Sequence, residues 1–253
     1  MNDRNIDLDR NLFLIAFSVV RWNWMPCAVA ALLLLASNAI MGFVNAPIAL
    51  AVLRALLLMI VGYSAYRFLL SDGGVSGWRA IATAEGRLPW RYAAMTLIIL
   101  SPVLVIGIVW NAPGTGMGPS SLGEIAFGVV MIVVYAALYI LVGTALPAIA
   151  ERGEVSLIEA FERGRRNYRA IGRALVFGAW LFRVGSLLFM IALVYLGVTT
   201  DFFSPGTGVF NAAAFGPMLL FMCSFVFAEC LTAIVLVRAY RRFPVMSSDA
   251  VTI

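Results

Sequence analysis

The chain contains neither lysine nor histidine, and only three of its 253 residues are cysteine. Without histidine it lacks the usual general base near neutral pH and the commonest ligand of transition metals. The cysteines, Cys27, Cys223 and Cys230, lie in apolar runs and form no Cys-x-x-Cys pair, so we expect buried thiols rather than a redox or metal centre. Nucleophile-elbow, zinc-helix and phosphate-loop motifs are also missing. We therefore predict no catalytic residue, no cofactor and no metal, and we expect the protein not to be an enzyme.

Charged residues are scarce as well. They make up 12% of the chain, against 62% hydrophobic residues, whereas a soluble domain has about 25% charged residues and about half apolar ones. This balance is typical of an integral membrane protein. The basic residues lie close to the ends of apolar runs and form no separate basic domain, so we expect no nucleic-acid partner.

The sequence consists largely of long apolar runs. About 20 apolar residues in a helix cross a hydrocarbon core of about 30 Å, and continuous runs without alternation favour helices over a barrel. Six runs are long enough: residues 25–44, 47–70, 92–110, 125–149, 174–198 and 214–239. We predict an all-α, polytopic membrane protein whose single membrane domain, residues 1–253, consists of three out-and-back helical hairpins, 25–70, 92–149 and 174–239.

A shorter apolar segment, residues 11–20, precedes the first run. About ten residues cannot cross a bilayer, and Trp22 and Trp24 follow, which are residues that favour the membrane interface. We therefore expect residues 1–24 to form a cytoplasmic segment with an interfacial helix. Acidic residues near the start argue against a cleaved signal peptide.

All 18 basic residues are arginines, and their distribution predicts the orientation. Sixteen fall on one side of the predicted membrane: Arg4, Arg10, Arg21, Arg67, Arg79, Arg87, Arg91, Arg152, Arg163, Arg165, Arg166, Arg169, Arg173, Arg238, Arg241 and Arg242. The loops on the other side contain none. By the positive-inside rule both termini, including the tail 240–253, lie in the cytoplasm.

Two opposite charges lie inside the fifth and sixth runs. Counting along each helix from the cytoplasmic border, Arg183 lies about 15 Å from Arg173 and Glu229 about 13.5 Å from Arg238. A charge at the centre of a membrane helix costs at least about 2.5 to 3.5 kcal/mol unless it is compensated. We predict that Arg183 and Glu229 form an ion pair, either as a structural staple or as part of a polar pathway.

Three further polar residues could belong to the same intramembrane site. Arg54 lies in the second run, where it could reach the pair or extend outward to the interface. Tyr135 and Tyr139 are one helical turn apart on the fourth run and could line the same interior, although such a pair is also typical of ordinary packing.

The connection 150–173 is the most structured polar stretch. Ser156 and Glu159 have the spacing of a capping box, which predicts that a cytoplasmic amphipathic helix begins there. Five arginines follow: Arg163, Arg165, Arg166, Arg169 and Arg173. They could hold anionic lipid headgroups or a phosphate-bearing ligand, or they could only set the topology.

Short sequences also repeat along the chain. Pro-Gly-Thr-Gly occurs at 113–116 and 205–208, and Ala-Tyr-Arg occurs at 65–67 and 239–241, each at corresponding places in the predicted hairpins. Repeated hairpins in one orientation occur among transporters.

A family resemblance rests on the passage after the fourth run. It comprises Leu146 to Gly153, then Ser156, Ala160 and Phe161, and then residues 168–173. This passage resembles uncharacterised bacterial six-helix inner-membrane proteins and the membrane domain attached to some glycerophosphodiester phosphodiesterases. The resemblance implies a bacterial inner-membrane protein. We expect no hydrolase activity from it, because the resemblance covers only the membrane domain and not the soluble phosphodiesterase domain.

These observations leave three classes of function open. The first is transport or lipid handling through a polar intramembrane site. The second is a non-catalytic membrane assembly or homeostasis factor, in which the Arg183–Glu229 pair is structural. The third is an intramembrane enzyme that uses carboxylates. The lipid bilayer is the expected partner in each case, together with anionic headgroups in the first.

Overall fold

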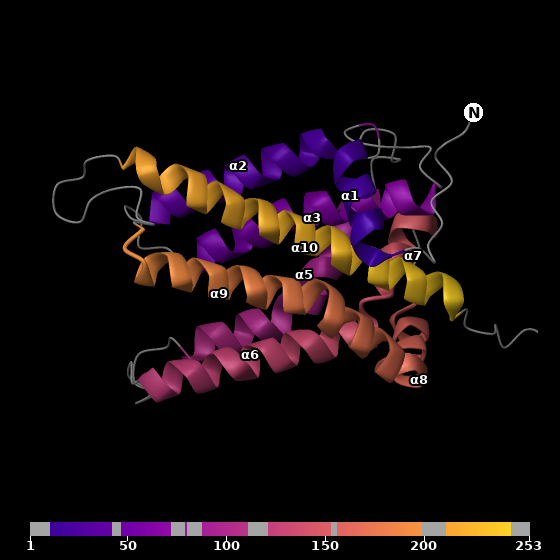
Figure 1. Cartoon of the computed structure of the whole chain (residues 1–253). Coiled ribbons are helices and arrows are strands. Elements are labelled where there is room, and N and C mark those ends of the chain that lie inside the picture. Colours follow the sequence, from indigo (N-terminus) through magenta and orange to yellow (C-terminus); the bar gives the residue numbers. More distant parts are fainter. Residues whose placement is uncertain are drawn as a thin grey trace, which may run out of the picture. The chain divides into compact units, whose positions relative to one another are not determined.

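The computed structural model describes residues 11–41, 47–71, 79, 88–110, 121–152, 156–198 and 211–243. Every regular element in these residues is helical (Figure 1), which confirms the all-α class. The helices are α1 (Leu12–Trp22), α2 (Trp24–Met41), α3 (Pro47–Leu70), α5 (Leu88–Trp110), α6 (Ser121–Val142), α7 (Ala145–Arg152), α8 (Leu157–Leu175), the π-helical η1 (Val176–Trp180), α9 (Leu181–Tyr195), the 3₁₀ turn η2 (Ala212–Ala214) and α10 (Phe215–Arg242).

Three stretches of the described chain are long and apolar enough to cross a membrane: Val52–Leu70, Leu157–Tyr195 and Ala212–Arg242. The number rises to five if two bent helix pairs each count as one span. The first pair, α1 and α2, is bent by 89°, and the second, the end of α6 with α7, is bent by 44°. Length and composition thus support a membrane protein with three to five candidate spans.

The structure divides the chain into two compact units. The first unit comprises Met1–Glu85 and Ala174–Val235, and the second comprises Gly86–Arg173 and Leu236–Ile253. The first repeat sequence, at 113–116 and 205–208, lies outside the described residues, whereas both copies of Ala-Tyr-Arg lie near the ends of helices, in α3 and α10.

In the first unit, α2 and α3 pack against each other, and α1 forms a separate helix, as the sequence predicted. Asn11 caps α1 by accepting a hydrogen bond from the Phe13 N–H at 3.0 Å. The sharp bend to α2 occurs at Asn23, which is buried and donates from its side-chain amide to the Val19 carbonyl at 2.9 Å. The Asn23 backbone N–H donates to the same carbonyl at 2.9 Å, so both nitrogens of Asn23 bond the last turn of α1 where the chain bends.

In the second unit, the predicted fourth run does not form one continuous helix. The helix is interrupted at Gly143 and Thr144. Pro147 explains the break, because its ring would clash with the Gly143 carbonyl in an α-helix and it has no N–H to donate there. The Leu146 N–H bonds the Gly143 carbonyl instead, at 3.1 Å in a tighter turn. The predicted run over 125–149 therefore contains two helices, and the end of α6 meets α7 at an angle of 44°.

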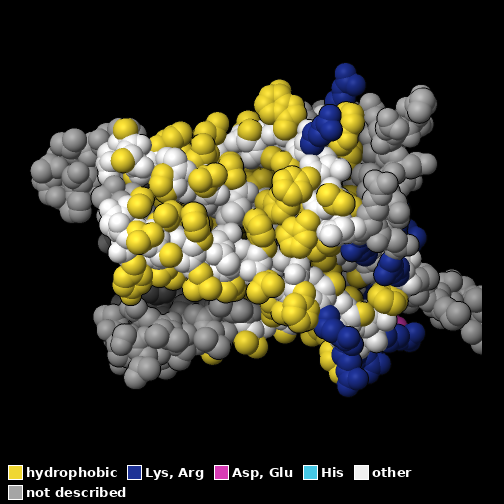
Figure 2. Space-filling view, in the orientation of Figure 1, with side chains coloured by type: hydrophobic (Ala, Val, Ile, Leu, Met, Phe, Trp, Pro, Cys, Tyr) yellow, Lys and Arg dark blue, Asp and Glu magenta, His cyan; other side chains and the backbone are white. Residues whose placement is uncertain are grey.

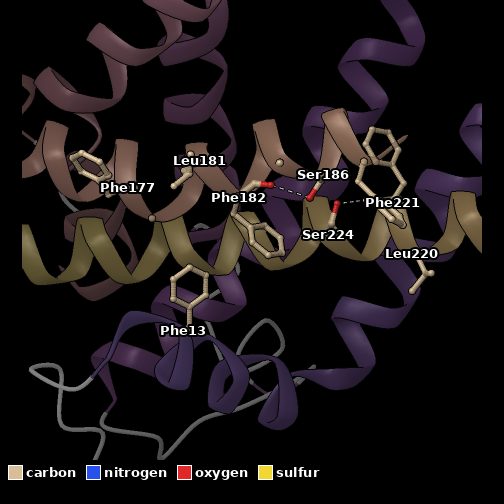
Figure 3. Close-up of a pocket in the computed structure, with 11 residues that line it drawn as sticks. Phe13, Phe177, Leu181, Phe182, Ser186, Leu220, Phe221 and Ser224 are labelled. Atoms are coloured by element: carbon tan, nitrogen blue, oxygen red, sulfur yellow. Dashed lines mark hydrogen bonds between the residues drawn. The ribbon is translucent and has the colours of Figure 1, made fainter. Parts of the chain in front are cut away.

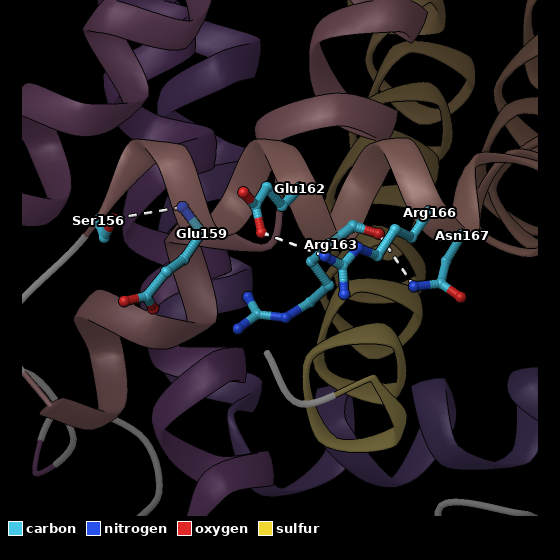
Figure 4. Close-up of polar contacts among 6 residues, drawn as sticks. All are labelled: Ser156, Glu159, Glu162, Arg163, Arg166 and Asn167. Atoms are coloured by element: carbon cyan, nitrogen blue, oxygen red, sulfur yellow. Dashed lines mark hydrogen bonds and ion pairs between the residues drawn. The ribbon is translucent and has the colours of Figure 1, made fainter. Parts of the chain in front are cut away.

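The predicted boundary between a cytoplasmic helix and the fifth run also needs correction. Ser156 does cap α8, since its hydroxyl accepts from the Glu159 N–H at 3.2 Å (Figure 4). However, α8 continues without a loop through η1 into α9, so the boundary at residues 173 and 174 lies inside helical structure. The helix is kinked at Asn167, whose side-chain amide donates to the Arg163 carbonyl at 3.0 Å.

Candidate functional site

The predicted intramembrane ion pair is present in the first unit. Arg183 Nη2 of α9 lies 2.8 Å from Glu229 Oε2 of α10. The Glu229 side chain is only 7% exposed and that of Arg183 20%. A charged hydrogen bond of this length in a low-dielectric setting is strong, and removing either partner leaves a costly buried charge. The equal depths counted along two antiparallel helices were therefore sufficient to predict the contact.

Four phenylalanine rings form a cluster, and two of them are close to this pair in the sequence of α9 and α10. The Phe182 and Phe227 rings lie 5.0 Å apart, centroid to centroid, and so link α9 to α10 beside Arg183 and Glu229. Phe13 of α1 lies 6.4 Å from both rings, and Phe17 lies 5.1 Å from Phe227. Helix α1 thus packs on α9 and α10 through aromatic contacts.

An open groove of about 520 Å³ runs along η1, α9 and α10, with α1 forming part of its wall. We call it the first groove; Figure 3 shows its lining. Its lining includes Phe13, Phe182, Leu220 and Phe221, which the figure labels. Gly185 and Phe189 also line it. A second groove of about 530 Å³ adjoins it and adds residues of α2, while sharing Phe13, Phe182, Leu220 and Ser224. Neither groove is lined by Arg183 or Glu229.

The remaining polar residues predicted for the membrane interior make other contacts. Arg54 donates to Ser37 Oγ at 3.3 Å and to the Asn38 side chain, which ties α3 to α2 within the first unit. The rings of Tyr135 and Tyr139 of the second unit pack against each other, tilted by 34°, with their centroids 4.5 Å apart. The structure therefore brings Arg183 to Glu229 and Tyr135 to Tyr139, and it attaches Arg54 to α2.

Arg163 differs from the other arginines of α8. It is buried, and its Nε donates to the Phe243 carbonyl at 2.8 Å while its Nη1 donates to Thr144 Oγ1 at 3.2 Å. Its guanidinium also lies 5.0 Å from the centre of the Tyr240 ring. Arg163 thus joins the α6–α7 break to the end of α10. Its expected role as an exposed lipid contact needs correction, because its charged group is enclosed by protein.

The other four arginines, Arg165, Arg166, Arg169 and Arg173, are exposed. Arg166 pairs with Glu162 at 3.6 Å, and Arg169 Nε donates to the Tyr168 hydroxyl at 2.9 Å. Basic side chains gather over α8 in Figure 2. Large apolar side chains are exposed on the first turns of the same helix, namely Leu157, Ile158 and Phe161.

Sequence reasoning missed a second polar cluster, around Tyr240. Its hydroxyl donates to Glu151 Oε2 at 2.6 Å, and the Arg152 guanidinium lies 5.9 Å from its ring centre. The partners are 89 residues apart in the chain, so local spacing could not reveal them. The available signal was the repeated Ala-Tyr-Arg sequence, which contains Tyr240.

The thiols agree with the prediction only in part. Cys27 and Cys230 are buried, but Cys223 is exposed and lines the second groove. Among the residues that the structure describes, no three potential metal ligands of the histidine, cysteine or carboxylate type cluster together.

No family model, curated protein or solved structure matches this chain. The resemblance to six-helix inner-membrane proteins thus stays a prediction, and the candidate sites are argued from geometry alone.

Proposed function

We propose that this chain is a multi-pass protein of the bacterial inner membrane that handles lipids and holds anionic headgroups on α8. Six spans in three hairpins, with both termini in the cytoplasm, form part of this proposal. The six apolar runs each overlap a helix or helix pair, which supports the proposal: α2, α3, α5, α6 with α7, α9 and α10. The basic residues at one set of run ends support the orientation.

The exposure of four arginines beside exposed apolar side chains carries the proposal. A helix with this mixture is suited to the membrane interface, where apolar groups enter the acyl region and basic groups meet headgroups. Guanidinium groups bind phosphate with paired hydrogen bonds. Each basic residue near an anionic leaflet contributes about 1 kcal/mol. Helices α8 and α9 belong to one candidate span, Leu157–Tyr195, and the arginines lie in its N-terminal half. We therefore expect them close to where this long helix would leave the bilayer.

The Arg183–Glu229 pair favours a structural role within this function. Both side chains are mostly buried, and neither lines either of the two grooves described above. An ion or polar substrate would need a polar route to these charges. The same observation supports the second candidate function, a non-catalytic membrane assembly or homeostasis factor in which the pair holds α9 to α10.

Headgroup binding predicts a lipid-dependent stability. In detergent micelles, added phosphatidylglycerol should raise the unfolding temperature more than phosphatidylcholine does, because a ligand that binds the folded state stabilises it. Replacing Arg165, Arg166, Arg169 and Arg173 together with glutamine should abolish that difference.

The matched control replaces the same four arginines with lysine, which keeps the charge and should keep most of the preference for phosphatidylglycerol. If the glutamine variant still distinguishes the two lipids as the wild type does, α8 is not the headgroup site and the proposal fails.

A further inference from the structure

We infer that the first groove is a binding site for a single acyl chain of a membrane lipid. This inference rests on the proposed lipid handling and deepens it, because it names the part of the lipid that the spanning helices hold. The headgroup site on α8 and the acyl site in the groove are separate claims about separate residues.

The lining of the groove selects an apolar ligand. Phenylalanines and Leu220 provide most of the wall. The two hydroxyl groups in it are already satisfied, since Ser186 donates to the Phe182 carbonyl at 2.9 Å and Ser224 donates to the Phe221 carbonyl at 2.6 Å (Figure 3). These two hydroxyl oxygens could still accept a bond, but they offer no free donor to an anion, so a charged substrate would lose its hydration here with little compensation. A hydrocarbon chain has no hydrogen bonds to lose when it enters the groove.

The location of the groove determines which apolar ligand can reach it. Apart from Phe13 of α1, its lining residues belong to Leu157–Tyr195 and Ala212–Arg242, which are candidate spans. Apolar side chains cover much of the surface that α9 and α10 present in Figure 2, and Leu187 and Leu188 are exposed next to the groove. On a membrane-spanning surface of this kind, the molecules in reach are the acyl chains of the bilayer.

The shape of the groove distinguishes it from ordinary lipid-facing surface. Gly185 has no heavy atom within 4 Å of the position that a Cβ would occupy, so the floor of the groove is open there. Lipid tails are as apolar as leucine, so a chain gains nothing from the hydrophobic effect by entering. Contact with walls on several sides gains dispersion energy instead. A volume of about 520 Å³ also falls within the range of small-molecule sites, about 300 to 1,000 Å³.

The test uses nanodiscs of phosphatidylcholine whose acyl chains carry a photoactivatable diazirine. After irradiation, mass spectrometry locates the adducts on the full chain. We expect adducts at Phe182, Phe189 and Leu220 in excess over adducts at Val194 and Leu196, which are exposed on or just after α9 but lie outside the groove.

Gly185→Trp should fill the groove and remove most of the groove adducts. Gly216→Trp is the matched control, because Gly216 also has open space around a Cβ but does not line the groove, and its adduct pattern should match that of the wild type. Leu220→Trp, at an exposed position of the groove wall, provides a second blocking variant if Gly185→Trp does not fold.

Adducts that follow side-chain exposure alone, and that persist in the blocking variants, would overturn the inference. Phosphatidylcholine carries no net charge, so this result does not depend on headgroup binding by α8. If groove labelling fails but phosphatidylglycerol still stabilises the protein, the proposed function stands without the acyl site. If groove labelling succeeds but the response to phosphatidylglycerol does not depend on the arginines of α8, the acyl site stands and the headgroup site fails.

Discussion

Replacing Arg183 with leucine should lower the free energy of unfolding by about 3 to 5 kcal/mol, the usual cost of breaking a buried ion pair on one side. The variant removes the guanidinium that lies 2.8 Å from Glu229, whose side chain is only 7% exposed. Among the described residues, Arg183 is the cation that forms an ion pair with this carboxylate. Glu229→Leu should cost a similar amount, because it leaves Arg183 without its counter-ion.

The double variant, Arg183→Leu with Glu229→Leu, should recover most of this loss. Exchanging a whole buried pair for apolar residues is often neutral or stabilising. Unfolding of the wild type, both single variants and the double variant in detergent gives the coupling energy directly. A structural pair also predicts that the double variant keeps its response to phosphatidylglycerol. Purely additive losses, with no coupling, would show that the two charges do not stabilise each other.

Gly164→Ala should have the second largest effect, a loss of about 1 to 3 kcal/mol or more from overpacking. A Cβ at Gly164 would lie 2.2 Å from the Leu141 carbonyl oxygen and 2.6 Å from that of Ile140. These are backbone atoms, so no side-chain rotation can relieve the clash, and α6 and α8 must separate. The loss should appear as a lower unfolding temperature in detergent.

Gly172→Ala is the control on the same helix. There the nearest atom is the flexible tip of Ile140, Cδ1, at 3.3 Å. Alanine in a helix gains up to about 1 kcal/mol over glycine, so this variant should be neutral or slightly more stable. Equal unfolding temperatures for the two alanine variants would contradict the close contact of α6 with α8.

The sequence predicted the features that can be counted along the individual helices. The Arg183–Glu229 contact followed from helical rise and from the cost of a charge in lipid, and the separate α1 followed from its length and its flanking tryptophans. Ser156 was recognised because its cap bonds a residue only three positions away. In each case the physical cause is local or is fixed by depth in the membrane.

Features that depend on packing between distant segments could not be predicted in this way. Arg163 looked like its four neighbours, but its partner Phe243 is 80 residues away. Hydropathy did not locate the break at Gly143, because it counts apolar side chains and ignores the missing N–H of Pro147. The first groove arises from four elements and from the open space at Gly185, neither of which has a signature in hydropathy.

The central claim, a multi-pass protein whose arginine-rich connections face the cytoplasm, is tested most directly by topology reporters. A phosphatase that is active only outside the cytoplasm and a fluorescent protein that matures only inside it would be fused at Gly77, Gly118 and Thr207 and after Ile253. We expect phosphatase activity at Gly118 and Thr207, and fluorescence at Gly77 and after Ile253. Fluorescence without phosphatase activity at Gly118 would contradict the assignment of the spans and the orientation together.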